Sequence, residues 1–536
     1  MARNKRDEVK TQVLIIGGGV TGAGLARDLA LRGVDSLLAE KGDINAGASG
    51  GNHGLLHSGA RYVGTDPAAA LECVEEGEIL KKTAPQCVEE SGGLFVAVAG
   101  DDEDYPVRFP ELCQRSGVWT RGLDPDLARG LEPALSSSLV AAFEVRDGVV
   151  DPFRLSFDNL AQAQALGARV RTGWEAVSMR SRGGRITRVG FRDHLRGGEV
   201  EVRPDLVINA AGAWAGQVAG LAGLELSILY SKGTLVVTQS RLTDRVINRL
   251  RPPSDADILV PGGTVSVAGT TSSRIDSPDR VRPSIQEVDR IIDGVRAMLP
   301  VLEETRFIRA YTGVRPLVST GDGDDDRRVS RDFSLVDHAR EGLENILTIA
   351  GGKLTTHRLM AEKAADLACK KLGIDRPCLT RTEPLPPSSL GRWTEPGSAP
   401  ISMMDLQEHE DPVLCECELV AGSTLDSILD DLDDLEGRNL LHALGLRSRM
   451  GKGPCQGCFC GLRVTAHLFD RGFFRGGSGV SQLKSFVERR WRGFRPVLWG
   501  SALVQAELQE ALLCGFLDLE LTAPDPAEGF GESRTG

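Results

Sequence analysis

The sequence of 536 residues has no long uninterrupted apolar run. The most apolar long stretch, residues 206–229, contains Asn209, Gln217 and Glu225 and is rich in glycine and alanine. Such a composition predicts a strand, a turn, a short helix and a second strand rather than a transmembrane helix. The first ten residues are mostly polar and charged, so we expect no signal peptide. Any association with a membrane is therefore expected to be peripheral or through a partner.

A dense stripe of lysine and arginine is also missing. The formal net charge is −12, which argues against nucleic acid as the main partner. A chain of this length exceeds one hydrophobic core, so two to four domains are expected. Eleven cysteines are present, and five of them crowd into residues 415–460. This uneven spacing is typical of a metal site in a reducing compartment and not of a secreted disulfide scaffold.

The strongest motif lies near the start of the chain, in VLIIGGGVTGAG (residues 13–24). An apolar strand ends at Gly17, and Gly19 and Gly22 complete G-x-G-x-x-G at the start of a predicted helix. In that context Gly17 permits a tight turn, Gly19 lets a pyrophosphate approach the backbone, and Gly22 allows close packing. Glu40 ends the next predicted strand, where a carboxylate can bind a ribose. The motif predicts a dinucleotide site and leaves NAD and FAD open.

A second apolar strand that ends at glycines is predicted late in the chain, at AGGKLTTHRLMAE (residues 350–362). This stretch again joins an apolar strand to a predicted helix, residues 353–372. Backbone N–H groups at Gly351 and Gly352 and the cation of Lys353 suit an isoalloxazine ring, whose reduced form is stabilised by positive charge. An ordinary strand–helix junction would have a similar pattern. A single NAD fingerprint would not require this element, so its presence favours FAD.

The remaining pattern predicts a doubly wound nucleotide domain interrupted by an antiparallel-sheet domain. Residues 168–179 are predicted as one strand, residues 186–191 and 199–202 as a hairpin, and residues 206–212 as a buried strand with a turn at Gly212. Residues 380–400 are rich in proline, serine and glycine and predict a linker. A small unit containing the cysteine cluster follows, and residues 482–519 are predicted to be helical.

Several long motifs together resemble the FAD-dependent glycerol-3-phosphate dehydrogenases. They are VLIIGGGVTGAGLARDLALRG, NHGLLHSGARY, DGVVDPFRL, PSDADILVPG, GVRPL, VSRDFSLVDH and GGKLTTHRLMAE. Their order is similar to that of the glycine/D-amino-acid-oxidase-like flavoproteins, and the anaerobic type of dehydrogenase also ends in a cysteine domain. The resemblance spans about residues 11–519.

The fold class implied is α/β plus α+β. A Rossmann-like FAD-binding domain (about 8–80, 150–225 and 305–372) would be interleaved with a D-amino-acid-oxidase-like antiparallel-sheet substrate domain (81–149 and 226–304). A linker (373–410), a small helical [2Fe–2S] domain (411–475) and a helical extension (476–536) would follow. The implied FAD contacts are Gly17, Gly19, Gly22, Glu40, Ser49, Gly212, Gly351, Gly352 and Thr355.

The resemblance implies oxidation of sn-glycerol 3-phosphate to dihydroxyacetone phosphate, with hydride transfer to flavin N5. A phosphate dianion needs fixed cations, and the motif matches assign this role to Arg61, Arg315, Arg331 and Lys353. His57 is the first candidate for the base, with His53 in the same loop, while Arg315 could polarise the alcohol and Lys353 completes the catalytic set. Aerobic relatives carry a histidine just after a Lys–Gly pair, but this sequence has Leu235 after Lys232-Gly233.

The clustered cysteines alone are compatible with zinc, an iron–sulfur cluster or a redox disulfide. The segment resembles the bacterioferritin-associated ferredoxin-like domain, a [2Fe–2S] fold. That resemblance assigns Cys415, Cys417, Cys455 and Cys460 as ligands, with Cys458 as the alternative to Cys460. A cluster beside a flavin can pass electrons on singly, so the expected acceptors are partner subunits leading to membrane quinone. We therefore expect a cytoplasmic protein, peripheral on the inner membrane face through those subunits.

Two other functions remain open on these residues. A dehydrogenase of a 2-hydroxy acid or secondary amine could use the same fold, although its carboxylate substrate would need fewer cations. A non-catalytic subunit that binds FAD and an iron–sulfur cluster only to transfer electrons is the second alternative.

Overall fold

The first sheet is built around the parallel strands that the glycine motif predicts. The computed structural model describes residues 8–318, 332–405, 411–432 and 435–517. Its strands run in the order β10-β11-β12-β1-β2-β9, and β20 pairs with β12 and β19. They are β1 (Glu8–Ile16), β2 (Ser36–Glu40), β9 (Arg169–Thr172), β10 (Trp174–Arg182), β11 (Arg185–Asp193), β12 (Glu199–Asn209), β19 (Phe333–Asp337) and β20 (Ile346–Gly351).

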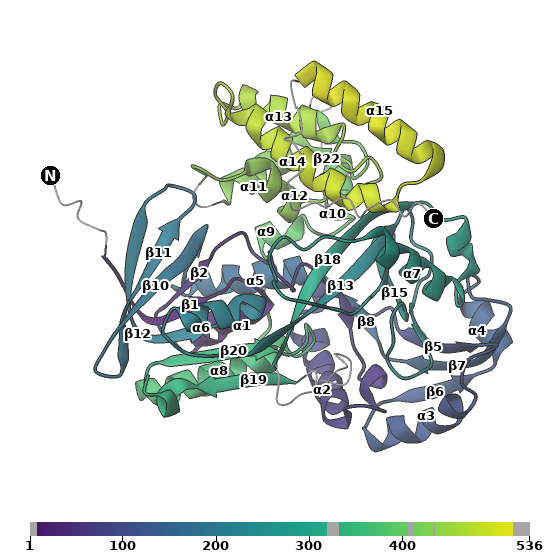
Figure 1. The fold of residues 1–536 in the computed structure, drawn as a ribbon, viewed down its shortest axis with the longest axis horizontal. Coiled ribbons are helices and arrows are strands. Elements are labelled where there is room, and N and C mark those ends of the chain that lie inside the picture. Colours follow the sequence, from purple (N-terminus) through teal and green to yellow (C-terminus); the bar gives the residue numbers. More distant parts are fainter. Residues whose placement is uncertain (1–7, 319–331, 406–410, 433–434, 518–536) are drawn as a thin grey trace, which may run out of the picture.

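Helices pack against this sheet (Figure 1). On one face a core of Leu25, Leu29, Phe157 and Ala364 joins the sheet to α1 (Val20–Leu31), α5 (Pro152–Ala165) and α8 (His357–Leu372). The other face is covered by α6 (Ala215–Gly220) and by side chains of β10 to β12. The carboxyl ends of β1 and β2 therefore open onto the turn at Gly17, which is the position of nucleotide sites in doubly wound sheets.

Three element boundaries differ from the prediction. The expected strand 168–179 is two strands, because Gly173 has a φ of +75° and its N–H bonds to Gly42 O. The strands expected at 199–202 and 206–211 are one strand, β12, which continues through Pro204. The helix expected from residue 353 begins at His357, because Gly351 and Gly352 both have positive φ and residues 353–356 form a turn.

The second sheet has the order β17-β13-β16-β15-β14-β5-β7-β6, with β18 paired to β13. Its strands are β5 (Gly93–Val98), β6 (Thr120–Leu123), β7 (Leu139–Val145), β13 (Ile228–Thr238), β14 (Val246–Arg249), β15 (Ile258–Gly262), β16 (Val265–Gly269), β17 (Ser273–Ile275) and β18 (Phe307–Val318). Helix α7 (Ile285–Arg296) packs on it. Although residues 305–372 are predicted to belong to the FAD-binding part, β18 lies in this second sheet, with Arg315 opposite Ser231.

Smaller elements complete this part of the chain. They are α2 (Pro67–Thr83), α3 (Asp104–Arg115), α4 (Pro125–Leu131) and a three-stranded sheet of β3 (Leu55–Leu56), β8 (Gly148–Val150) and β4 (Val88–Glu89). Strand β3 and the loop before it cross between the two sheets, so residues 47–57 face both.

The C-terminal helices form a lobe of their own at one end of the molecule (Figure 1). The lobe consists of α10 (Ser398–Asp405), β21 (Val413–Cys415), β22 (Val420–Ala421), α11 (Gly422–Asp430), α12 (Leu440–Arg447), α13 (Cys460–Asp470), α14 (Ser478–Phe494) and α15 (Gly500–Leu517). The helical stretch expected over 482–519 is thus two helices within the described residues, separated near Pro496 and Gly500.

The expected linker is packed rather than loose. Residues 389–392 form the short helix α9 (Ser389–Arg392), and Leu385, Trp393 and Ala399 are buried. Trp393 and Ala399 belong to the core of the C-terminal lobe. Proline and serine dominate the local composition, and only these few apolar side chains anchor the segment, which explains why its pattern resembles a linker.

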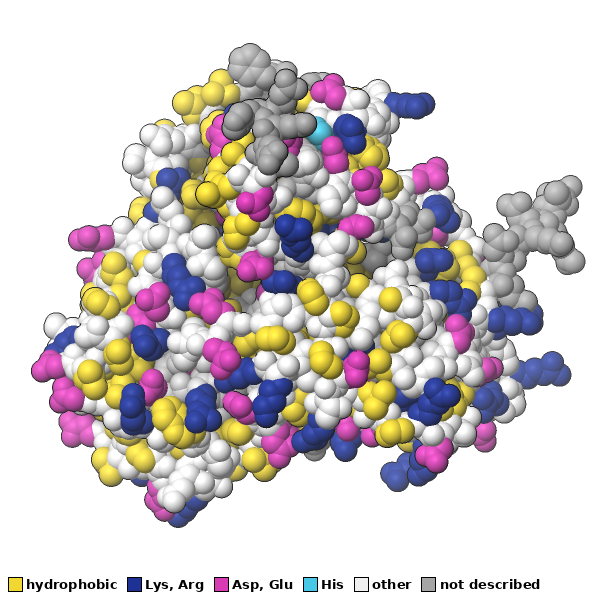
Figure 2. Space-filling view, turned by 180° about the vertical axis from the view of Figure 1, so that it is seen from behind, with side chains coloured by type: hydrophobic (Ala, Val, Ile, Leu, Met, Phe, Trp, Pro, Cys, Tyr) yellow, Lys and Arg dark blue, Asp and Glu magenta, His cyan; other side chains and the backbone are white. Residues whose placement is uncertain are grey.

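The surface carries charges of both signs (Figure 2). On the face shown in Figure 2, lysine and arginine side chains alternate with aspartate and glutamate. None of the helices in the described part of the chain combines the length and apolar character that crossing a bilayer requires.

Candidate functional site

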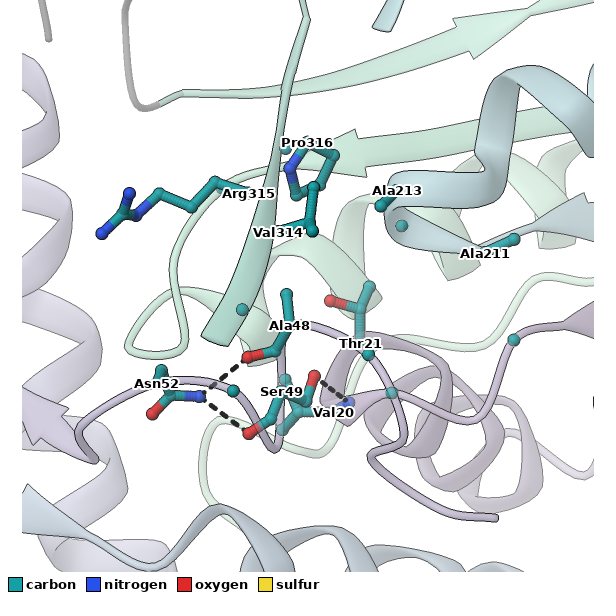
Figure 3. Close-up of a pocket in the computed structure, with 18 of the residues that line it drawn as sticks. Val20, Thr21, Ala48, Ser49, Asn52, Ala211, Ala213, Val314, Arg315 and Pro316 are labelled. Carbon is teal, nitrogen blue, oxygen red and sulfur yellow. Dashed lines mark hydrogen bonds between the residues drawn. The ribbon is translucent and has the colours of Figure 1, made fainter. Parts of the chain in front are cut away.

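The glycine turn has the geometry that a dinucleotide needs. Gly17 has a φ of +120°, and a Cβ there would lie 2.4 Å from Ala210 O. A Cβ on Gly22 would lie 2.0 Å from Gly17 O, so the first turn of α1 packs tightly on the glycine loop. The Val20 N–H donates to Ser49 Oγ at 3.0 Å, which brings the loop of residues 47–52 against the start of the helix (Figure 3). These contacts leave space at Gly19 where a phosphate can meet backbone N–H groups.

Glu40 lies at the end of β2, as predicted, beside this turn. Its carboxylate accepts hydrogen bonds of 2.7 Å from Gly18 N and from Gly42 N. Burial raises the pKa of the Glu40 carboxyl, and the two backbone N–H groups oppose that shift. Since a carboxylate can accept about four hydrogen bonds, the group still has capacity for a ribose hydroxyl.

One cavity of about 980 Å³ connects the turn with the second sheet. A volume of this size is at the upper end of small-molecule sites. The predicted residues that line it are Gly17, Gly19, Glu40, Ser49, His53, His57, Arg61, Gly212, Arg315, Gly351, Gly352 and Lys353. Gly22 and Thr355 are not among its lining residues; Thr355 is fully buried and its Oγ1 accepts a 3.3 Å hydrogen bond from His57 N. Arg331 lies outside the described residues.

The two described arginines reach the cavity from different elements. Arg315 lies on β18 (Figure 3). It donates through Nη1 to Thr271 O at 3.2 Å and through Nη2 to Thr270 Oγ1. Arg61 donates through Nη2 to Ser254 O at 3.2 Å and to Asp257 Oδ2 at 3.1 Å. Its Nη1 is buried and has no hydrogen-bond partner among the described residues. A buried N–H without a partner is costly, so this atom favours an anionic ligand in the cavity.

Two histidines line the same cavity as these arginines and Lys353. The rings of His53 and His57 are 6.2 Å apart, and Tyr62 Oη is 3.5 Å from His57 Nε2. Burial, together with the charges of Arg315 and Arg61, lowers the pKa of His53 to about 3, so its ring is neutral. A neutral imidazole next to fixed cations can accept a proton only at high cost, which leaves His57 as the better acceptor of the two.

Lys353 is fixed from the opposite side. Its Nζ lies 5.5 Å from the centroid of the Tyr62 ring and 3.9 Å from Glu72 Oε2. Burial raises the pKa of Glu72, while the charge of Lys353 opposes that shift. Tyr62 and Glu72 were not expected at the site from the sequence. The position of Tyr62 directly after Arg61 in HSGARY could have indicated the first, but Glu72 lies on α2 with no motif of its own.

The segment around Leu235 does not supply a catalytic group. Leu235 is 1% exposed and packs in β13, paired with Gly269 and Tyr311. Its neighbour Gly233 does line the cavity. The departure from the aerobic pattern therefore leaves an apolar core residue at that position.

The four predicted cluster cysteines are brought together in the C-terminal lobe. The Cys460 thiol hydrogen-bonds with Cys415 and Cys455, and Cys455 interacts with Cys417. Hydrogen bonds from the Cys460 thiol and from the N–H groups of Phe459 and Gly457 lower the pKa of Cys455 to about 5. No set of three His, Cys, Asp or Glu side chains has metal-ligand spacing in the described part of the chain.

Cys458 has different neighbours. Burial raises the pKa of its thiol to about 11. It lines a small cavity of about 60 Å³ together with Arg490, Trp491 and Cys514. Cys458 is thus not part of the hydrogen-bonded set formed by Cys415, Cys455 and Cys460.

Comparisons with known proteins show the family of this chain. A family model described as FAD dependent oxidoreductase matches residues 12–367, which makes the chain a member of that class. One subunit of the anaerobic glycerol-3-phosphate dehydrogenase of Escherichia coli K12 is 40% identical, over 97% of this chain and 99% of the relative. The corresponding subunits of Haemophilus influenzae and Haloferax volcanii are 41% identical (96% and 95%) and 38% identical (93% and 89%). The chain therefore belongs to this family of anaerobic glycerol-3-phosphate dehydrogenase subunits.

Solved structures support the fold. A glycerol-3-phosphate dehydrogenase from Bacillus halodurans complexed with FAD aligns with a TM-score of 0.61 at 20% identity, over 92% of this chain and 97% of that one. An L-alpha-glycerophosphate oxidase from Mycoplasma pneumoniae aligns with a TM-score of 0.58 at 19% identity, over 70% and 99%. These likenesses confirm the predicted oxidoreductase fold.

Proposed function

We propose that this chain is the catalytic subunit that oxidises sn-glycerol 3-phosphate to dihydroxyacetone phosphate with FAD. The observation that carries the proposal is the buried Nη1 of Arg61, which lies in the same cavity as Arg315 and Lys353 and has no hydrogen-bond partner within the described part of the chain. Three cations around one cavity match a phosphate dianion better than the single carboxylate of a 2-hydroxy acid or an amino acid. The names of the relatives support the same substrate.

The glycine turn, Glu40 and the glycines at residues 351–352 would hold FAD, which when bound supplies the hydride acceptor at N5. Arg61 and Arg315 would bind the substrate phosphate and fix the secondary alcohol in the cavity. His57 would take the hydroxyl proton at Nε2, the atom that Tyr62 Oη approaches to 3.5 Å. Lys353 would place positive charge beside the flavin ring. Arg331 belongs to the predicted phosphate site and lies outside the described residues.

The C-terminal lobe would hold a [2Fe–2S] cluster through Cys415, Cys417, Cys455 and Cys460. The proposal is supported by the thiol contacts and by backbone N–H groups of Gly451, Gly457 and Phe459 directed at cysteine sulfurs, since such bonds stabilise the thiolates that bind a cluster. The relatives are named as subunits, so partner subunits would carry electrons onward to membrane quinone. The chain would then be peripheral on the inner membrane face.

Anaerobic bleaching of the flavin tests the substrate. The purified protein is mixed without oxygen with glycerol 3-phosphate, lactate or sarcosine, and the absorption of oxidised flavin is followed. We expect bleaching by glycerol 3-phosphate alone. Bleaching by lactate or sarcosine but not by glycerol 3-phosphate would overturn the assignment. Bound flavin that no substrate reduces, but that dithionite reduces, would instead indicate a non-catalytic electron-transfer subunit.

A further inference from the structure

A buried ion-pair cluster joins the C-terminal lobe to the nucleotide-binding sheet. Arg447, at the end of α12, donates through Nη2 to Asp43 Oδ1 at 2.7 Å and through Nη1 to Asp43 Oδ2 at 2.9 Å. Arg438 approaches the same Oδ2 with Nη1 at 3.4 Å and donates through Nη2 to Thr172 Oγ1 at 2.8 Å. A two-pronged arginine–carboxylate contact fixes orientation as well as distance.

The cluster is shielded from solvent. The exposed fractions of the side chains are 9% for Asp43, 4% for Arg447 and 8% for Arg438. The Arg447 guanidinium also lies 4.9 Å from the centroid of the Phe157 ring, in the core below α1. Loss of one member would leave a buried charge without its partner, a costly arrangement.

Asp43 belongs to the segment that closes the FAD site. Three residues before it, Glu40 accepts the N–H of Gly18, and two residues after it, Asn45 N donates to Gly18 O at 3.0 Å. Asp43 Oδ1 also accepts the N–H of Ile44 at 2.8 Å. The glycine turn is therefore hydrogen-bonded to residues 40–45, and these residues are fixed by the C-terminal lobe. Neither arginine nor Asp43 lines the FAD cavity.

The same arginines are connected to the cysteine loops. Arg449, two residues after Arg447, pairs with Glu418 at 2.5 Å, and Glu418 follows Cys417 directly. Gln482 on α14 bonds to Leu440 N and to Arg438 O, which fixes the start of α12. The structure thus contains a continuous set of contacts from the cysteine loops, through α12, to the loop of Glu40.

We infer that the Asp43–Arg447–Arg438 cluster makes the C-terminal lobe a structural part of the FAD site, so that the two arginines are positioning residues for FAD binding. The inference rests on the proposed FAD site. Without the arginines, residues 40–45 lose the buried ion pairs that fix Asp43, and FAD must order that part of the loop itself. Free energy spent on ordering a loop appears as weaker binding.

FAD titration of the flavin-free full-length protein tests this inference. The dissociation constant is measured from the quenching of flavin fluorescence, and circular dichroism verifies that each variant is folded. We expect Arg447→Met to raise the dissociation constant about tenfold, within the usual range of coupling between distant sites. Asp43→Asn in the Arg447→Met background should recover part of that loss, because it removes a buried carboxylate that has lost its two-pronged partner.

Glu395→Gln is the matched control, because it removes another ion pair between the body and the C-terminal part, Arg154–Glu395 at 2.6 Å, which does not touch residues 40–45. Its affinity for FAD should equal that of the wild type. If Arg447→Met does not fold, Arg438→Met provides a second test. It removes only the longer contact to Asp43 and should weaken FAD binding about threefold, which is less than the effect of losing the two-pronged contact of Arg447. Wild-type affinity in a folded Arg447→Met or Arg438→Met variant overturns the inference. A wild-type protein that binds no FAD would instead refute the proposed function.

Discussion

The guanidinium of Arg315 lies directly against the backbone of Gly233. A Cβ at residue 233 would stand 2.6 Å from Arg315 Nη2 and 2.8 Å from Cζ. The two residues lie diagonally across the paired strands β18 and β13, because Arg315 is opposite Ser231 and Gly233 is opposite Gly313. Only glycine at position 233 lets the guanidinium cross β13 and reach the cavity, so the cation of the proposed phosphate site depends on a residue without a side chain.

Gly233→Ala should displace Arg315 without unfolding the sheet. Because a hydrogen bond to a charged group contributes about 1.5–3 kcal/mol, we expect KM for glycerol 3-phosphate to rise roughly tenfold or more while FAD stays bound. Steady-state kinetics with an artificial electron acceptor measure this. Gly262→Ala is the control, since its Cβ would have no neighbour closer than 3.8 Å. An unchanged KM in Gly233→Ala would show that Arg315 does not bind the phosphate.

His57→Asn should slow substrate oxidation and leave binding nearly intact. General-base catalysis contributes about 10²–10⁴-fold, so the rate of flavin reduction by glycerol 3-phosphate should fall by about that factor. Rapid-mixing absorption measurements without oxygen give this rate directly. His194→Asn replaces an exposed histidine paired with Glu175 and should behave as the wild type. A rate within a few-fold of the wild type in His57→Asn would show that His57 is not the base, and Arg315 would then act only by polarising the alcohol.

Buried histidines predict that stability falls in mild acid. Burial lowers the pKa of His357 from 6.5 to about 4, and its Nδ1 lies 3.0 Å from Leu354 O. Between these pH values the unfolded chain binds a proton that the folded chain does not, so the free energy of unfolding rises with pH through this window. At pH 4.5 the loss attributable to His357 is about 2–3 kcal/mol relative to pH 7.

His357→Gln should remove that part of the pH dependence, since its amide can still donate to Leu354 O and does not titrate. Urea unfolding of the FAD-bound protein at pH 7 and pH 4.5 provides the comparison. The variant should lose about 2–3 kcal/mol less stability between the two pH values than the wild type does. Equal losses in both proteins would mean that His357 does not titrate with the predicted shift.

Local pattern was sufficient for the features that depend on neighbouring residues. The turn at Gly17 and the position of Glu40 follow from a strand, a glycine loop and a helix in succession, and the structure has both. Pairing between distant segments could not be predicted in this way. Strand β18 has an apolar pattern that suits either sheet, and only its register with β13 places Arg315 in the cavity.

Contacts between the C-terminal lobe and the rest of the molecule were even harder to predict from the sequence. Asp43 and Arg447 are 404 residues apart, and neither lies in a motif. Glu72 reaches Lys353 from α2, on a helix whose pattern indicates only packing. Ion pairs of this kind are determined by how whole domains dock, and a single sequence contains no periodicity or spacing that records docking.

The fourth ligand of the proposed cluster is decided by comparing two neighbouring cysteines. Cys460 is 1% exposed and hydrogen-bonds with Cys415 and Cys455, whereas Cys458 has no such bond to these two thiols and lines a small cavity beside Cys455 and Arg490. Cys460→Ser should therefore lose iron and the iron–sulfur EPR signal of the reduced protein, and Cys458→Ser should keep both. Iron loss in Cys458→Ser alone would exchange the two assignments. The proposed cluster would be refuted if the wild type contained zinc in place of iron and gave no EPR signal after reduction. Zinc cannot change its oxidation state, so it could not pass electrons from the flavin to a partner.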